Sequence, residues 1–497
     1  MISSIVIAHL VVSLCAPWLA RRIGSNGYLV MALVPAVGFG WLLGLAPLIT
    51  SGGGYVESVP WIPQLGVEIH YRVGLLQWLL ALIVTGIGAL VLLYCRWYFE
   101  AGANPRTMGI LTAFAAAMLG LVTVDDLVML YVFWELTTVF SYLLIGYDPT
   151  RRANRSAAMT ALIVTTTGGL AMLVGIVALG QTAGTFSLSA ILAQPPTGSV
   201  PTAAALLMLV GALSKSALVP FHFWLPGAMA APTPISAYLH AAAMVKAGVY
   251  LVAAMAPTFA AVPGWRLAVG MLGATTMILG GWRALRQNDI KLLLAYGTVS
   301  QLGFMVLLCG FGTQATMLAG IAMLIGHALF KATLFLIVGV VDHSTGTRDL
   351  TKLSGLGRRM PLLATLAVLA IGSGLTRPPL FGMLSMLASE EEQGFTLGIA
   401  QSAGSLARIA GPVFASTTYD WHLSFPYLTC AVIAMACGLW VWTRMPRRIA
   451  ATASARSAPS CPCCARSTSI ATTPPAYLAK YDECEVATPP ELSRKEV

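Results

Sequence analysis

The chain has 497 residues, of which 57% are hydrophobic and only 10% are charged, with a net charge of +10. Soluble globular proteins carry about 25% charged residues, so this composition excludes a cytosolic enzyme, a secreted disulfide module and a disordered chain. It predicts an all-α, polytopic integral membrane protein, in which lipid replaces water around most of the surface and each helix pairs its own backbone groups.

Fourteen apolar runs approach the ~20 residues that a helix needs to cross a bilayer. They predict about 14 transmembrane helices, because the strands of a membrane β-barrel would show only alternation over ~10 residues. The runs lie at 2–20, 28–49, 73–95, 107–124, 127–147, 157–180, 203–225, 235–256, 267–283, 290–311, 315–341, 361–388, 395–417 and 424–443. Residues 446–497 are rich in Pro, Ser, Thr and Ala and have no apolar period, so a disordered tail is expected there.

The basic residues predict the orientation, because Lys and Arg concentrate in cytoplasmic loops. With the N-terminus outside, the connections of the first eleven runs place fourteen Lys and Arg inside and only Arg72 and Arg266 outside. We therefore expect a cell-membrane protein with its N-terminus outside, and its positive charge does not indicate binding to nucleic acid. The last three runs break this pattern, since the same alternation places Glu390–Glu392 and the basic residues that follow residue 443 outside.

Four charged residues stand out inside the apolar runs, where a charge costs roughly 2.5–3.5 kcal/mol on the insertion scale and indicates a functional site. They are Glu135, Lys215, Lys246 and Lys331. A lysine that has a movable carboxylate partner can load and release a proton, because burial favours the neutral amine and the carboxylate favours the ammonium. A buried Lys–Glu pair could instead tie two helices together, and this alternative stays open for each residue taken singly.

Histidines accompany these charges and could relay protons, because histidine titrates near neutrality. They are His222, His240 and His327. On a continuous helix His222 would share the face of Lys215, from which it is seven residues away. By the same argument His327 would share the face of Lys331, which follows it by four residues.

Prolines predict that the helix carrying Lys215 is broken. Pro220 falls within the seventh run, where it removes a backbone hydrogen bond and frees polar groups at membrane depth. Broken helices next to intramembrane charges are typical of ion pathways. Pro226, Pro232 and Pro234 set an irregular re-entry, AMAAPTPISAYLHAAAMVKAG (228–248). His240 would point to a different side of its helix from Lys246, six residues later.

Charges at the ends of the runs have less specific explanations. Asp125 and Asp126 lie where a predicted helix begins, and we expect them to form a solvated cap. Lys291 also lies near a helix start, so it could be either a membrane anchor or part of a proton relay.

Four long motifs resemble the antiporter-like subunits that Mrp-type Na+/H+ antiporters share with respiratory complex I. They are VFWELTTVFSYLLIG (132–146), SKSALVPFHFWLPGAMAAPTPISAYLHAAAMVKAGVYLV (214–252), NDIKLLLAYGTVSQLGFM (288–305) and GHALFKATLFLIVG (326–339). HAAAMVKAG around Lys246 and VPWIPQLGVEIHYRVG (59–74) are most similar to the large A-type member of the Mrp complex. The resemblance covers roughly residues 1–365.

This resemblance implies an antiporter-like helix bundle within a hetero-oligomeric membrane assembly that moves protons. Proton movement would be coupled to Na+ or another monovalent cation in an Mrp complex, and to electron transfer in complex I. By motif match, Glu135 corresponds to the family's glutamate of helix five, Lys215 to its partner lysine in the broken helix, and Lys246 to the central lysine. His240, His327 and Lys331 also fall on family motif positions.

The C-terminal part departs from that family. LAVLAIGSGLTRPPLFGMLSMLASEEEQGFTLGIAQSAGSLARIAGP (366–412) resembles the last helices of a major facilitator superfamily transporter and holds no intramembrane lysine. The predicted organisation is an antiporter-like proton-translocating domain at 1–365, three facilitator-like helices at 366–445 and the tail at 446–497. The sequence therefore indicates a fusion or frame-disrupted product with a junction near residues 363–372.

The favoured hypothesis is a membrane subunit of an Mrp-like monovalent cation/proton antiporter, with other Mrp-like subunits, the cation, protons and the lipid bilayer as partners. The alternatives are a proton-pumping subunit of NADH:quinone oxidoreductase without a redox centre of its own, a facilitator-type solute transporter, and a non-functional fusion product.

We expect no cofactor, because the chain lacks a nucleotide-binding glycine loop and a cysteine cluster for iron–sulfur ligation. We expect no metal site, because the spacing of Cys461, Cys463 and Cys464 is too tight for structural zinc.

Overall fold

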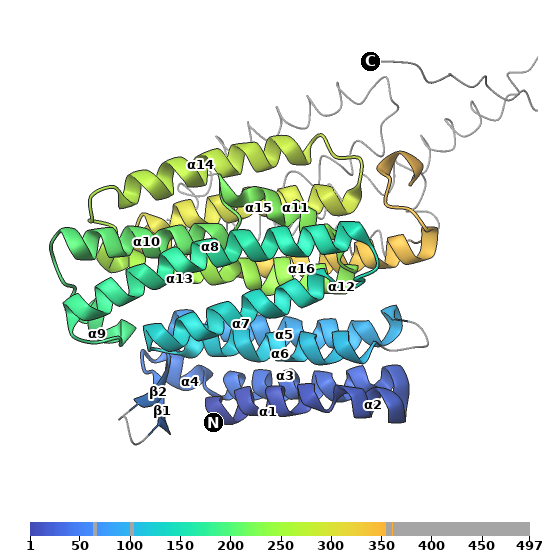
Figure 1. Ribbon diagram of the computed structural model, residues 1–497, viewed down its shortest axis with the longest axis horizontal. Coiled ribbons are helices and arrows are strands. Elements are labelled where there is room, and N and C mark those ends of the chain that lie inside the picture. The colour runs from blue at the N-terminus through green and yellow to red at the C-terminus, as the bar shows by residue number, and fades with distance from the viewer. Residues whose placement is uncertain (63–66, 100–103, 354–359, 361–497) are drawn as a thin grey trace, which may run out of the picture. The chain divides into compact units, whose positions relative to one another are not determined.

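A computed structural model describes residues 1–62, 67–99, 104–353 and 360 (Figure 1). All of them lie within the compact unit formed by residues 1–401. The three runs beyond residue 360, the facilitator-like stretch at 366–445 and the tail at 446–497 lie outside the described residues. The described residues therefore belong to the part of the chain whose motifs resemble an antiporter.

Helices occupy each of the first eleven apolar runs, as the sequence predicts. They are α1 (Ile2–Leu14), α2 (Ala16–Ile23), α3 (Gly27–Gly44), α4 (Ala46–Thr50), α5 (Leu75–Tyr98), α6 (Pro105–Thr123), α7 (Leu127–Ile145), α8 (Arg152–Ala183), α9 (Leu188–Ala193), α10 (Ser199–Lys215), α11 (Trp224–Gly227), α12 (Thr233–Ser236), α13 (Met244–Phe259), α14 (Trp265–Ala284), α15 (Ile290–Gly310) and α16 (Gln314–Thr345). Within the described ranges, eight helices or helix pairs are long and apolar enough to cross a membrane, and α1 and α10 are shorter apolar helices. The chain is an all-α polytopic membrane protein.

The helices begin and end where the sequence supplies caps. The carboxylate of Asp126 accepts from the amide of Met129 at the start of α7, and that of Asp289 accepts from the amides of Lys291 and Leu292 at the start of α15. The long helices α8 and α16 both end at a glycine in the left-handed region, where a side chain would be strained. These caps fix where α7 and α15 begin and where α8 and α16 end.

Packing brings the helices that carry the predicted site residues together. The helix α8 packs against both α7 and α10, and α13 packs against α10 and α15. The helix α16 contacts α5, α12 and α15. Figure 1 shows α8 and α10 side by side across the middle of the described bundle. The buried lysines of these helices, Lys215, Lys246, Lys291 and Lys331, therefore face other helices.

The helix that carries Lys215 is broken, as the sequence predicts. α10 ends at Lys215 itself, and the following turn is held by the amide of Val219, which donates to the hydroxyl of Thr276 at 3.0 Å. A second irregularity lies in the segment where the prolines predict an irregular re-entry, but its π-helical form was not predicted. A π-helix at Ala237–Ala242 ends at Ala243, where the backbone leaves helical geometry before α13 begins. Both lysines, Lys215 and Lys246, thus lie beside a break.

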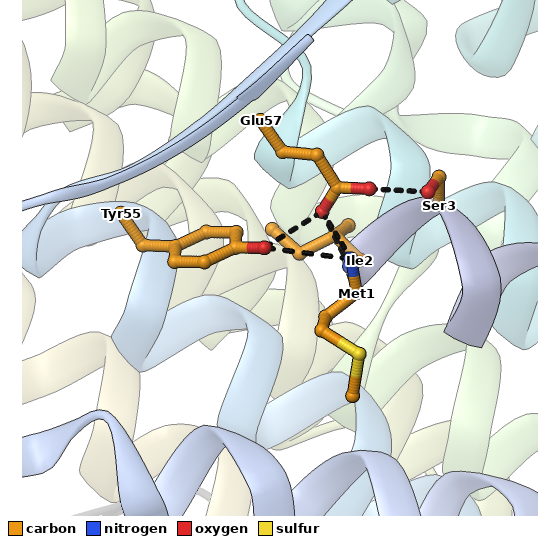
Figure 2. A network of polar contacts seen from close by, with 5 residues as sticks. All are labelled: Met1, Ile2, Ser3, Tyr55 and Glu57. Atoms are coloured by element: carbon orange, nitrogen blue, oxygen red, sulfur yellow. Dashed lines mark hydrogen bonds and ion pairs between the residues drawn. The ribbon is translucent and has the colours of Figure 1, made fainter. Parts of the chain in front are cut away.

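A two-stranded antiparallel sheet, β1 (Tyr55–Ile62) and β2 (Val67–Val73), lies outside the helices, with Tyr55 opposite Val73. Figure 2 shows how Glu57 of β1 holds the start of α1. The Glu57 carboxylate accepts from the ammonium of Met1 at 2.7 Å, the amide of Ile2 at 2.8 Å, the hydroxyl of Tyr55 at 3.0 Å and the hydroxyl of Ser3. Burial alone would raise the pKa of Glu57, but these hydrogen bonds outweigh it and lower the pKa to about 2.

The two aspartates at the start of α7 have different roles. Asp126 caps the helix as predicted. Asp125 instead joins two loops, because its carboxylate accepts from the hydroxyls of Ser187 and Ser189, each at 2.7 Å, and its amide donates to the carbonyl of His70. The sheet, α7 and the start of α9 are therefore linked at one end of the bundle.

Candidate functional site

The first part of the site joins α7 and α10 around Lys215. This lysine is completely buried, and its Nζ donates to the carbonyl oxygen of Trp134 and to Oγ1 of Thr138, both at 2.7 Å. Nζ also lies 5.0 Å from the centre of the Trp134 ring, within the range of a cation–π contact. The partners of Lys215 are thus Trp134 and Thr138, which belong to α7 and lie on either side of Glu135 in the sequence.

The Glu135 side chain lies against α8. Its Oε1 is buried and has no hydrogen-bond partner among the described residues. A Cβ at Gly169 would clash with this oxygen, and a Cβ at the adjacent Gly168 would clash with the hydroxyl of Ser214. Two glycines of α8 therefore let the carboxylate of α7 and the end of α10 approach the same helix.

The second part of the site joins α13 and α16 around Lys246. The Lys246 Nζ donates to the carbonyl oxygen of Ala241, which the π-helix presents to it, and lies 3.2 Å from Nδ1 of His327. Both side chains are buried. His327 and Lys331 share one buried face of α16, as their spacing predicts. The structure thus brings together an amine and an imidazole that are 81 residues apart in the sequence.

Several of these buried groups have polar atoms without a protein partner in the described part of the chain. They are Nζ of Lys331, Nε2 of His327 and both ring nitrogens of His240. Buried polar atoms are normally hydrogen-bonded, so these atoms are where a mobile proton carrier such as water would bind. His240 is framed by the rings of Trp224 and Phe335, whose centroids lie 6.3 and 6.5 Å away.

The helical spacing cannot be applied to two histidines, because the helices are not continuous there. His222 lies in a 3₁₀ turn, Phe221–Phe223, after α10 has ended, so it does not share a helical face with Lys215. It is also only partly buried. His240 lies in the π-helix and Lys246 in α13, so the 100° spacing does not relate their directions either. Both are buried, but they come from separate segments.

Lys291 lies between the helix cluster and a cavity of about 880 Å³. It is 1% exposed, and its Nζ donates to the carbonyl oxygen of Ala231. The cavity is lined by the ends of α5 and α16 and by the loops that precede α8 and α15, including Tyr98, Tyr147, Asp148, Asn154, Lys291 and Arg348. At its rim Arg348 pairs with Asp289 at 3.4 Å. An open space therefore reaches the buried Lys291 side chain.

This arrangement can hold and pass protons. Ammonium, carboxylate and imidazole groups that lie within a helix bundle can exchange protons when they move into hydrogen-bond range. Thr138, Gly168 and Gly169 contribute to the geometry and were not predicted. Glu135 and Lys215 can be found in the sequence because a charge in an apolar run is costly to insert into a membrane. A threonine or a glycine carries no charge, so this criterion does not detect Thr138, Gly168 or Gly169.

The comparisons agree with the motifs. The family model described as NADH:quinone oxidoreductase/Mrp antiporter, TM, matches residues 124–389, more than half of the chain. The chain is 45% identical over 376 residues to the A/B subunit of a probable K(+)/H(+) antiporter from Rhizobium meliloti, covering 74% of this chain and 36% of that protein. It is 41% identical over 385 residues to the A-type subunit of the Na(+)/H(+) antiporter from Alkalihalophilus pseudofirmus, covering 74% and 48%.

A solved structure shows the same fold. A chain of the Mrp complex from Dietzia sp. DQ12-45-1b superposes with a TM-score of 0.68 at 37% identity, covering 80% of this chain and 45% of that one. The chain thus spans about a third to a half of the length of the curated relatives it matches. None of these matches supports the facilitator-like interpretation of residues 366–445, and the family model continues past residue 365 to residue 389.

Proposed function

The chain belongs to the NADH:quinone oxidoreductase/Mrp antiporter family of membrane subunits, and from this premise we propose that it is one component of a multi-subunit Mrp-like antiporter. It would exchange protons for a monovalent cation across the cell membrane. Protons would move through the intramembrane residues described above, Glu135, Lys215, Lys246, His327 and Lys331, with His240 and His222 beside them. The N-terminus would lie outside, as the distribution of basic residues predicts.

One observation carries this proposal. Three lysines, Lys215, Lys246 and Lys331, are fully or almost fully buried on helices that pack within the bundle, and in the described residues none of them has an ion pair shorter than 4 Å. Uncompensated charge at membrane depth is unfavourable, so such lysines are retained where protonation changes are part of the function. A structural helix tie would instead hold each ammonium against a carboxylate.

The cation is open to experiment, since the two relatives described above are named for K+ and for Na+. The partners we propose are other Mrp-like subunits, because the superposable chain comes from a solved Mrp complex. A component of NADH:quinone oxidoreductase is the second candidate, since the family description includes it. We propose no redox centre in this chain for either case.

Co-purification and exchange together test the proposal. The tagged chain, expressed together with the small subunits of an Mrp-like antiporter, should retain them through purification. Everted vesicles that contain this assembly should lose a preformed pH gradient when Na+ or K+ is added. Recovery of quinone oxidoreductase subunits instead, with no cation-dependent loss of the gradient, would favour the second candidate and overturn the first.

A further inference from the structure

The hydroxyl of Thr138 is the only side-chain oxygen that accepts a hydrogen bond from Lys215 in the described part of the molecule. Thr138 is completely buried one helical turn after Trp134 on α7. Its Oγ1 donates to the Trp134 carbonyl oxygen at 3.2 Å and accepts from the Lys215 Nζ at 2.7 Å. The first bond orients the hydroxyl, so that a lone pair faces the ammonium.

This geometry leaves the lysine and the glutamate apart. An ammonium has three protons to donate, and two of them are taken up by the Trp134 carbonyl and Thr138. The Glu135 carboxylate lies against Gly169 of α8, and its Oε1 accepts no hydrogen bond from a described residue. The structure therefore shows Lys215 docked on neutral oxygens of α7 beside a carboxylate that it does not bind.

We propose that Thr138 is a positioning residue for proton transfer, whose hydroxyl docks Lys215 in the state in which the lysine is separated from Glu135. This inference rests on the proposed function. Removing the hydroxyl leaves the ammonium with one protein acceptor at membrane depth. The lysine would then stay with the carboxylate, and the step that separates them would slow.

The neighbouring Thr137 is a matched control that the chain itself supplies. It is also completely buried on α7, and its Oγ1 also donates to the Trp134 carbonyl, at 2.7 Å. Thr137 makes no hydrogen bond to a lysine in the described structure. Valine matches threonine in shape and lacks the hydroxyl, so T137V and T138V delete the same backbone contact, and only T138V deletes the contact to Lys215.

Exchange by the assembled complex gives the first test. We expect T138V to lower the maximal rate of cation-driven proton exchange about tenfold, the size of effect that loss of a hydrogen bond to a charged group gives. The cation concentration at half-maximal rate should stay unchanged, because the cation does not contact Thr138. T138S, which keeps the hydroxyl, should restore most of the rate, and T137V should resemble the unmodified complex. Equal rates for T138V and T137V would overturn the proposal.

Thermal stability gives a second test that does not require transport. In a double-mutant cycle, T138V should lower the melting temperature of the purified assembly when Lys215 is present, and should have a much smaller effect in the K215M background. T137V should have the same effect in both backgrounds. Absence of coupling between positions 138 and 215 would overturn the proposal. Coupling without exchange by the unmodified complex would support the docking contact and refute the proposed function instead.

Discussion

Lys246 and His327 are titratable side chains of two different helices that lie within hydrogen-bond distance. Nζ of Lys246 and Nδ1 of His327 lie 3.2 Å apart, so only one of these two nitrogens can hold a proton on the line between them at a time. A proton that enters on either residue can therefore be handed to the other without a large movement. The sequence places both in apolar runs, but it could not predict that they meet, because that depends on how α16 packs against the π-helix that precedes α13.

Replacing either residue should stop proton transfer. We expect Lys246→Ala and His327→Ala each to lower exchange by the assembled complex about 100-fold, within the range attributed to a positioned proton donor or acceptor. The matched control is His9→Ala, which removes another completely buried histidine, on α1, away from the lysines. Exchange is measured as cation-induced loss of a pH gradient in vesicles. Equal losses in all three variants would show that burial alone matters.

Glu57 predicts a pH dependence of stability outside the membrane. Its pKa is lowered from 4.5 to about 2 in the folded chain, so its contribution is present above pH 4.5 and is lost as the pH falls toward 2. We expect Glu57→Gln to lower the free energy of unfolding by about 1 kcal/mol at neutral pH, since Met1 is largely exposed and screening weakens its ion pair.

A melting series of the two proteins between pH 2 and pH 7 measures this effect. The difference between the unmodified chain and Glu57→Gln should be constant at neutral pH and should shrink below pH 4.5. Glu68→Gln, which changes an exposed carboxylate on the partner strand, is the control. A difference that grows as the pH falls would contradict the hydrogen-bond network that Figure 2 shows.

At the scale of helices, the breaks in the helices do more to position the site residues than the membrane-spanning lengths do. The composition and the apolar runs predict that eleven helices precede residue 341, and Pro220 predicts the break after Lys215. The π-helix at Ala237–Ala242 has no signal in the sequence, because its alanine-rich segment favours an ordinary helix. That is why a helical angle could not relate His240 to Lys246. Tertiary packing, with every residue of the segment buried, decides the local geometry there.

The glycines of α8 predict a substitution that acts on Glu135 without changing it. We expect Gly169→Ala to displace the carboxylate, because the added Cβ would clash with Oε1, and to lower exchange strongly. Gly326→Ala on α16 adds the same methyl group where nothing lies within 4 Å, and should leave exchange unchanged. Both variants are measured in the assembled complex, with the amount of assembly as a control. Normal exchange by a fully assembled Gly169→Ala complex would contradict the position of Glu135.

At the scale of the whole molecule, topology follows from where the basic residues lie. The loop before α15 lines the cavity that reaches Lys291 and lies near several arginines. The sheet formed by β1 and β2 belongs to a connection that the positive-inside rule places outside. The distribution of basic residues therefore predicts opposite sides for the cavity and for the sheet.

Thiol labelling tests this orientation. Cysteines introduced by Asn288→Cys, at the cavity, and Ser58→Cys, on β1, occupy exposed positions. In a background without native cysteines, an impermeant reagent added to intact cells should label the Ser58→Cys chain and not the Asn288→Cys chain. Everted vesicles should show the reverse. Labelling of both chains from one side would refute the predicted topology.

The central claim is that a glutamate on α7 and a buried lysine on α10 move protons in exchange for a cation. The most direct measurement compares the assembled complex with its Glu135→Ala and Lys215→Ala variants in everted vesicles that hold a pH gradient. We expect added Na+ or K+ to collapse the gradient with the unmodified complex, and we expect both substitutions to abolish this effect while assembly is retained. Collapse at the unmodified rate by both substituted complexes would contradict the claim.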